Sequence, residues 1–307
     1  RGEEAIPAGA VVVCDEASAM PTRALDRLAS LVSARAGRLL LVGDRAQLPA
    51  VDAAGAFAAL ADRLGSVELR ENRRQRTELQ RRVAERLAEG AAAEAIALLC
   101  EHGRLGSYSD ARDARNALIA SWARRHADEA ATALILAHDR REVALLNAMA
   151  RSALDGAGHL GATRITAAGR EWATGDRLVC RRNDYRLDVR NGTRGTVVDV
   201  DADRHALSVR LDDGRDVRLP PGYLRHVEHG YALTGHTSQG ATVDRTYLLA
   251  TPERGGREWA YVAASRQRID LEVFAVHHDQ DRLRDALERA WSRSQAKSLA
   301  IDLAVPE

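Results

Sequence analysis

A strand, a helix and a second strand lie within residues 10–42, and this order leaves few fold classes open. Residues 10–16 (AVVVCDE) form a β-branched run that ends in two acids, which predicts a buried strand. Residues 22–35 carry apolar side chains at helical spacing, and residues 38–42 predict a second buried strand that breaks at Gly43. Two strands joined by one helix favour a parallel sheet, and therefore an α/β fold.

The α/β pattern continues along the chain but is interrupted once. Residues 76–100 have helical spacing, and residues 133–154 predict a strand followed by a helix. Residues 168–228 differ, because dense turn sequences separate short alternating runs, which is typical of a small all-β module. Strands return at 242–250 and 270–276, so we expect the β module to be an insertion within a second α/β domain.

Composition bounds the class of protein and its surroundings. The 307 residues are too many for one compact core, and the net charge of +1 gives no global field that would attract nucleic acid. The spacing of Cys14, Cys100 and Cys180 fits neither a zinc site nor a disulfide framework, so a reduced cytoplasmic setting is expected. No apolar run approaches the ~18 residues of a membrane span, so no membrane segment is expected. The only lysine is Lys297, and the remaining basic residues are arginines, which suit phosphate contacts.

Polar residues gather where the predicted strands end. Asp15 and Glu16 follow the first strand, where an acid pair can serve a metal ion and a water molecule, although such pairs also cap helices. After the second strand, GDRAQLPAV (residues 43–51) places Asp44 and Gln47 in a turn, and Asp44 can also act as a helix cap. Three further polar segments follow: LRENRRQ (69–75), YALTGHTSQGATVD (231–244) and YVAASRQR (261–268).

In this order, the segments resemble superfamily 1 DNA helicases of the RecD-like, 5′→3′ branch, and more closely the helicase part of conjugative relaxase–helicases. DEAS corresponds to helicase motif II, GDRAQLPAV to motif III, ENRRQ to motif IV, YALTGHTSQGATVD to motif V and YVAASRQR to motif VI. The resemblance covers residues 10 to about 277. It implies RecA-like P-loop NTPase motor domains, the first of them partial, with an inserted small SH3-like β-barrel.

The resemblance also implies how the chain is divided. The expected parts are the end of the first motor domain (1–65), the first part of the second motor domain (66–167), the inserted β module (168–228), the remainder of the second motor domain (229–277) and a helical tail (278–307).

ATP and Mg²⁺ are the implied cofactors. Asp15 would hold Mg²⁺ through water, Glu16 would act on the attacking water, and Gln47 would sense the γ-phosphate. Arg74 and Arg266 would reach the nucleotide from the second motor domain as arginine fingers. Further nucleotide contacts are expected from Asp44, Gln239 and Gly240.

Single-stranded DNA is the implied partner. Thr234, His236, Thr237 and Ser238 would contact its backbone, and Thr237 stands where many relatives have lysine, which would weaken one contact. Tyr185 has arginines on both sides and can stack on a base, but it can equally be a core residue.

One departure from the family pattern is large. No G-x-x-x-x-G-K-[ST] phosphate loop (Walker A) occurs in the sequence, and residue 1 is arginine rather than methionine. We therefore expect the chain to begin inside a larger parent protein whose preceding region carries that loop, and to be inactive in isolation.

Two functions follow from the resemblance. The first is the helicase region of a conjugative relaxase, with ATP-dependent 5′→3′ translocation and duplex unwinding during DNA transfer. The alternative is a vestigial helicase-fold module that binds single-stranded DNA without hydrolysing ATP. An arginine-rich structural protein would leave the order of the motifs unexplained.

Overall fold

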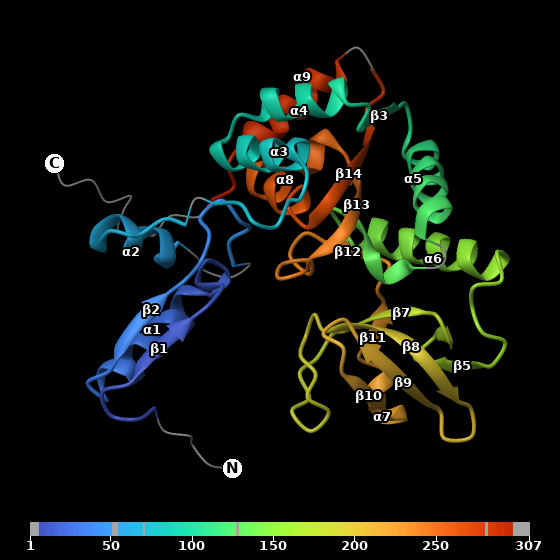
Figure 1. The fold of residues 1–307 in the computed structure, drawn as a ribbon, viewed down its shortest axis with the longest axis horizontal. Coiled ribbons are helices and arrows are strands. Elements are labelled where there is room, and N and C mark those ends of the chain that lie inside the picture. The colour runs from blue at the N-terminus through green and yellow to red at the C-terminus, as the bar shows by residue number, and fades with distance from the viewer. Residues whose placement is uncertain (1–5, 51–54, 70, 127–128, 280–281, 297–307) are drawn as a thin grey trace.

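The computed structural model describes residues 6–50, 55–69, 71–126, 129–279 and 282–296. Figure 1 shows a small N-terminal α/β lobe, a larger α/β domain and a β module inserted in that domain. Val51 and Arg70, which belong to two of the polar segments, and residues 297–307 of the expected tail lie outside the described residues.

The N-terminal lobe is built on two parallel strands. Strands β1 (Val11–Cys14) and β2 (Arg38–Leu41) pair directly, and α1 (Thr22–Ser33) connects them, as the sequence predicts. Two more helices complete the lobe: η1 (Ala17–Ala19) and α2 (Ala56–Leu64). Leu25 and Val32 are the buried residues of α1.

One expectation about this lobe is wrong. Both strands were predicted to be buried, but Val11 is 63% exposed, Val13 58% and Leu40 52%. Side chains alternate between the faces of a strand, so these exposed positions belong to one face of the sheet. No described element covers that face.

The larger domain contains a five-stranded parallel sheet in the order β12-β4-β13-β14-β3. Its strands are β3 (Leu105–Tyr108), β4 (Ala133–Ala137), β12 (Ala232–Thr234), β13 (Val243–Ala250) and β14 (Gln267–Val276). One face of the sheet packs against α3 (Glu78–Glu89), α4 (Ala92–Glu101), α8 (Arg257–Ala263) and α9 (Leu283–Ser292), and the other against α5 (Ala111–His126) and α6 (Arg140–Gly156) (Figure 1). Short 3₁₀ turns lie at η2 (Ala130–Thr132) and η3 (Pro252–Arg254).

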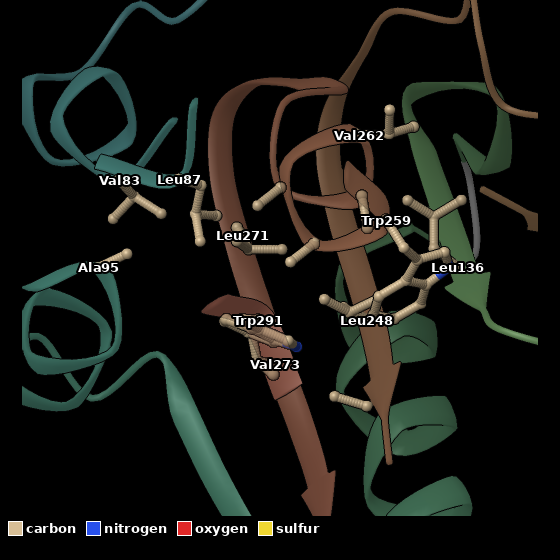
Figure 2. Close-up of a cluster of buried hydrophobic side chains, with 14 of the residues drawn as sticks. Val83, Leu87, Ala95, Leu136, Leu248, Trp259, Val262, Leu271, Val273 and Trp291 are labelled. Carbon is tan, nitrogen blue, oxygen red and sulfur yellow. The ribbon is translucent and has the colours of Figure 1, made fainter. Parts of the chain in front are cut away.

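The hydrophobic core between the sheet and helices α3, α4, α8 and α9 joins helices that are distant in sequence. Figure 2 shows Val83 and Leu87 of α3 beside Leu271 of β14, with Trp291 of α9 in the same layer. The predicted helix over residues 76–100 is two helices, because Gly90 adopts φ +84° and ends α3. Within the expected helical tail (278–307), the described helix is α9, and its apolar side belongs to this core.

The inserted module is built mainly of β-strands, as the turn-rich sequence predicts, and its strands pair antiparallel. Its main sheet has the order β10-β9-β8-β7-β11, and a separate hairpin precedes it. The hairpin is β5 (Arg164–Ala167) and β6 (Arg170–Ala173); the sheet strands are β7 (Arg177–Cys180), β8 (Arg194–Asp201), β9 (Ala206–Leu211), β10 (Asp216–Leu219) and β11 (Val227–His229), with α7 (Pro221–Leu224) before β11. The module has its own core around Trp172 and Val209. Within the described ranges, no helix is long and apolar enough to cross a bilayer.

Candidate functional site

The predicted acids stand at the carboxyl ends of β1 and β2. Asp15 and Glu16 follow β1, and the loop of residues 43–50 follows β2, so parallel pairing brings both segments to one edge. Two hydrogen bonds fix them together, because the amide of Ala17 donates to Val42 O (2.8 Å) and the amide of Asp44 donates to Ser18 Oγ (3.3 Å).

Glu16 has a strained backbone. Its φ of 53° and ψ of 35° are left-handed, a conformation that costs a non-glycine residue about 1–3 kcal/mol. Both acids are exposed, and the amide of Glu16 donates to Asp15 Oδ1 at 2.8 Å. The strain turns the chain sharply at the strand end, where the two carboxylates lie.

The second side of the site carries two arginines. Arg266, between α8 and β14, is 1% exposed. Its Nε donates to Val262 O (3.0 Å) and its Nη2 to Ser265 Oγ (2.9 Å), whereas its Nη1 is buried without a hydrogen-bond partner. Arg74 donates from Nη1 to Ser265 O at 2.9 Å, so both guanidinium groups meet at Ser265.

Electrostatics link these arginines to the N-terminal lobe. Burial, and then the charge of Arg74, lower the pKa of Arg266 to about 10. The charges of Tyr261, Glu16 and Asp44 oppose that shift in the pKa of Arg266. The structure therefore brings Glu16, Asp44, Arg74 and Arg266 to one site, although they come from segments up to 250 residues apart in sequence.

Gln75 is a site residue that the sequence reasoning missed. It is 3% exposed, and its Nε2 donates to Ser265 O (3.1 Å) and Gln267 O (2.8 Å), on either side of Arg266. A glutamine after an arginine carries no signal of its own, and its acceptors lie about 190 residues away. It fixes the backbone that presents Arg266.

Direct contacts cross from the lobe to the larger domain. Tyr261 Oη on α8 donates to Asp44 Oδ2 at 2.8 Å, and Gln239 Nε2 donates to Leu48 O at 3.0 Å. Burial, and then the charge of Asp44, raise the pKa of Tyr261, so the phenol remains a donor. Tyr261 is the first residue of the segment YVAASRQR (261–268), and no role was predicted for it.

Gln47 lies between these contacts. Its Nε2 donates to Asp44 Oδ2 at 3.4 Å, and its Oε1 is buried without a partner. An unpaired buried acceptor on Gln47 and an unpaired buried donor on Arg266 each cost about 1–3 kcal/mol until a ligand or water pairs with them. Both atoms are therefore available to pair with a polar ligand or a water molecule.

Of the residues predicted to contact DNA, Thr234 ends β12, and His236, Thr237 and Ser238 lie in the loop that follows it. Thr234 Oγ1 and Thr237 Oγ1 are hydrogen-bonded at 3.1 Å, and His236 is exposed. Ser238 is 0% exposed, and its Oγ donates to Gly235 O at 2.8 Å, so in this structure its side chain shapes the loop rather than facing outward. Gly240 adopts φ +76° in the turn that ends the loop.

A cavity of about 550 Å³ lies beside this loop, between α6 and the β module. Thr234 and Thr237 line it together with Arg140 and Arg151 of α6 and Arg181 of the module. Arg181 connects the β module with the loop after β12. Its Nη1 donates to Thr237 Oγ1 (3.2 Å) in the loop, and its Nε lies 3.2 Å from Glu228 of the module. Arg181 is one of the arginines near Tyr185 in the sequence, and no contact with the loop after β12 was predicted for it.

Tyr185 is 85% exposed, so it is not a core tyrosine.

A smaller cavity of about 330 Å³ on the module side is lined by Thr237, Gln239 and Gly240. Gln239 and Gly240 therefore lie beside the β module, and Gln239 also reaches the lobe through its hydrogen bond to Leu48 O. Among the described residues, no group of three or more His, Cys, Asp or Glu side chains could hold a metal ion.

Comparison with known proteins gives both sequence and structural relatives. A family model described as an AAA domain matches residues 2–110. The conjugal transfer protein TraA of Agrobacterium fabrum is 35% identical over 306 residues, which are 98% of this chain and 28% of that protein. The ATP-dependent RecD2 DNA helicase of Deinococcus radiodurans is 30% identical over 279 residues, 84% of this chain and 35% of that helicase.

A solved structure shares the fold. The Pif1 helicase from Bacteroides, in complex with ADP-AlF₃ and single-stranded DNA, matches with a TM-score of 0.54 and 18% identity, covering 86% of this chain and 70% of that chain. The chain spans only about a quarter of the length of the conjugal transfer protein that it matches.

Proposed function

Since the chain is a RecD- and Pif1-like superfamily 1 helicase region, homologous over nearly its whole length to conjugal transfer protein TraA, we propose that it is the rear part of an ATP-driven motor on single-stranded DNA. The motor would move 5′→3′ and unwind duplex DNA during DNA transfer. The observation that carries the proposal is the buried Arg266, whose unpaired Nη1 belongs to the same site as Glu16.

The residues of the site fit the γ-phosphate side of ATP. Burial lowers the pKa of Arg266 most, and repulsion from Arg74 lowers it further. An anion between the two guanidinium groups would relieve that repulsion. Bound Mg²⁺·ATP would supply the phosphoanhydride bond and the charge that develops when it breaks.

On the opposite side, exposed carboxylates are available to Mg²⁺ and water. Mg²⁺ keeps several waters and is often held by one or two carboxylates, so Asp15 can hold it without a larger acidic cluster. Glu16 would orient or deprotonate the attacking water, and Gln47 would pair its buried Oε1 with that water or a phosphate-bound one.

The phosphate loop motif does not occur in this sequence, and the exposed face of the lobe supports a place for a segment that carries it. Strands of parallel sheets are normally covered on both faces, yet Val11, Val13 and Leu40 leave one face of the lobe open. We propose that a segment of a longer parent protein, carrying the G-x-x-x-x-G-K-[ST] loop, covers this face and completes the first motor domain.

Single-stranded DNA is the proposed partner of the loop after β12. Thr234 and Thr237 offer hydroxyls, and Arg140 and Arg181 offer guanidinium groups at the mouth of the same cavity. Tyr185 is a further exposed aromatic surface for a base.

The experiment uses a longer protein that contains this chain together with the phosphate loop. Arg266→Ala should lower DNA-stimulated ATP hydrolysis ~10³–10⁵-fold, because it removes the charge that stabilises the transition state. Glu16→Gln should lower it about 10²–10⁴-fold, because it removes the group acting on water. Both variants should bind a single-stranded oligonucleotide within about threefold of the unmodified protein, since neither residue lies in the loop after β12.

The control is Arg112→Ala on α5, whose side chain is 78% exposed and distant in sequence from every motif. Near-normal turnover by Arg266→Ala or Glu16→Gln would overturn the role assignment. The alternative is a module that binds single-stranded DNA without hydrolysing ATP, and a preceding region without a G-x-x-x-x-G-K-[ST] loop would support it. Oligonucleotide binding without turnover in the longer protein would support that alternative.

A further inference from the structure

The loop after β2 inserts one side chain into the core of the larger domain. Leu48 is 3% exposed and belongs to the same buried cluster as Leu233, Trp259 and Val262. Among the described residues before α3, Leu48 is the one that belongs to this cluster. A leucine from the lobe therefore lies in a hydrophobic core that is otherwise built by residues of the larger domain.

The larger domain has a socket for this leucine. A Cβ added at Gly235 would lie 3.1 Å from Leu48 Cδ1 and 2.9 Å from Trp259 Cδ1, both closer than van der Waals contact. The glycine has φ outside the left-handed region, so its backbone does not require glycine. Its missing side chain instead leaves room for both Leu48 and the indole of Trp259.

Two hydrogen bonds secure the loop on either side of Leu48. Tyr261 Oη holds Asp44, and Gln239 Nε2 holds the carbonyl of Leu48 itself. Tyr261 and Trp259 both belong to α8, and Gly235 and Gln239 both belong to the loop after β12. The lobe is thus attached to the two elements that lead to Arg266 and to Thr237.

The attachment fixes the position of Gln47. Its neighbour Leu48 is in the socket and Asp44, which accepts from Gln47 Nε2, is held by α8. Arg266 is tied to the same helix through its hydrogen bond to Val262 O. Contacts with the same helix, α8, therefore position both Gln47 and Arg266, which carry the unpaired atoms.

We propose that Leu48 is a positioning residue: seated in the Gly235–Trp259 socket, it sets the lobe against the larger domain so that Gln47 and Asp44 meet Arg266. The chemistry of that site rests on the proposed function. The contact of Leu48 with Gly235 and Trp259, called the joint below, does not depend on it. It requires that Leu48 and Gly235 interact directly and that Trp259 is covered by Leu48.

The joint is tested in this chain without ATP or DNA. Leu48→Ala should uncover Trp259, giving a red-shifted emission and an acrylamide quenching constant that rises at least about twofold, because the other three tryptophans stay buried. Leu48→Met should restore the unmodified spectrum, since methionine fills a similar volume. Leu25→Ala is the matched control: it also truncates a leucine that is 3% exposed, but within the lobe, and should leave the quenching constant unchanged.

A double-mutant cycle tests the contact itself. Gly235→Ala should displace Leu48 and therefore also raise the acrylamide quenching constant of Trp259. In the double variant Gly235→Ala/Leu48→Ala, the rise in this constant should be smaller than the sum of the two single-variant rises, because the new methyl group occupies the space that Leu48 vacates. Additive effects, or unchanged quenching in folded Leu48→Ala, would overturn the joint. If Leu48→Ala does not fold, two variants still test the joint. Gly235→Ala should raise the quenching constant of Trp259, and Leu48→Met should leave it unchanged.

A positioning role makes one further demand in the longer, ATP-hydrolysing protein. Leu48→Ala should lower kcat by about 10–100-fold, the order expected for a displacement of about 1 Å, while the KM for ATP stays within about threefold. A raised KM with unchanged kcat would contradict positioning. Absence of hydrolysis in the unmodified longer protein would instead count against the proposed function, and the quenching result would still decide the joint.

Discussion

At the scale of single residues, the site holds unfavourable features that a stable fold does not need. Glu16 adopts a left-handed backbone, and Arg266 is buried with an unpaired Nη1 next to another guanidinium group. Each feature costs free energy of folding, and each lies on a residue predicted to work on ATP. Strain that collects at such positions is what a preorganised catalytic site shows.

The strain at Glu16 gives a prediction for stability. Glu16→Gly should raise the free energy of unfolding by about 1 kcal/mol, because glycine adopts φ 53° without a Cβ penalty. Glu16→Ala removes the same carboxylate but keeps the Cβ, so it should not stabilise. Urea unfolding followed by circular dichroism measures both. Equal stabilities of the glycine and alanine variants would show that the backbone conformation at Glu16 carries no strain.

At the scale of elements, sequence periodicity predicted α1, α6 and the parallel strands β1, β2, β4, β13 and β14, but it did not predict α2, α5 or β3. The strand and helix of residues 133–154 appear as β4 and α6, since their apolar spacing is local information. The break at Gly90 was missed because the apolar spacing continues across it. The ordered motifs predicted Glu16, Gln47 and Arg266, but Gln75, Tyr261 and Leu48 could not be found, because their partners lie about 190 residues or more away in sequence.

The end of α5 gives a prediction for pH. His126 is 5% exposed; burial, and then Arg245, lower its pKa to about 4, and its Nε2 has no hydrogen-bond partner. The folded-state pKa lies below the ordinary value of ~6.5, so between these values the unfolded chain binds more protons than the folded one. Stability should therefore fall as pH falls from about 6.5 towards 4, by up to about 1.4 kcal/mol per pH unit from this group.

The variant His126→Gln isolates that group. Glutamine does not titrate and can keep a hydrogen bond to Thr132, whose Oγ1 lies 3.1 Å from Nδ1 of His126. Its free energy of unfolding, measured by urea titration from pH 4 to 8, should depend less steeply on pH than that of the unmodified chain. His138 and His229, whose pKa values burial also lowers, would account for a remaining slope of the same sign. Parallel pH curves for the two proteins would remove His126 as a source.

At the scale of the whole molecule, the larger domain and its β module each have a full core, whereas the N-terminal lobe does not. The larger domain buries both faces of its parallel sheet, and the β module encloses Trp172. The lobe carries the carboxylates of the site, yet its described residues form a sheet of two strands with an exposed apolar face. This contrast supports a motor whose first domain is completed by a further segment that brings the phosphate loop.

The most direct test of that account is DNA-stimulated ATP hydrolysis, measured for this chain alone and for the same chain joined to an upstream segment with a G-x-x-x-x-G-K-[ST] loop. The account predicts no stimulated turnover by the chain alone and clear stimulation by single-stranded DNA in the longer protein, because Arg266 and Glu16 act only on a phosphate that the loop holds. Equal turnover by both proteins, or none by the longer protein, would contradict it.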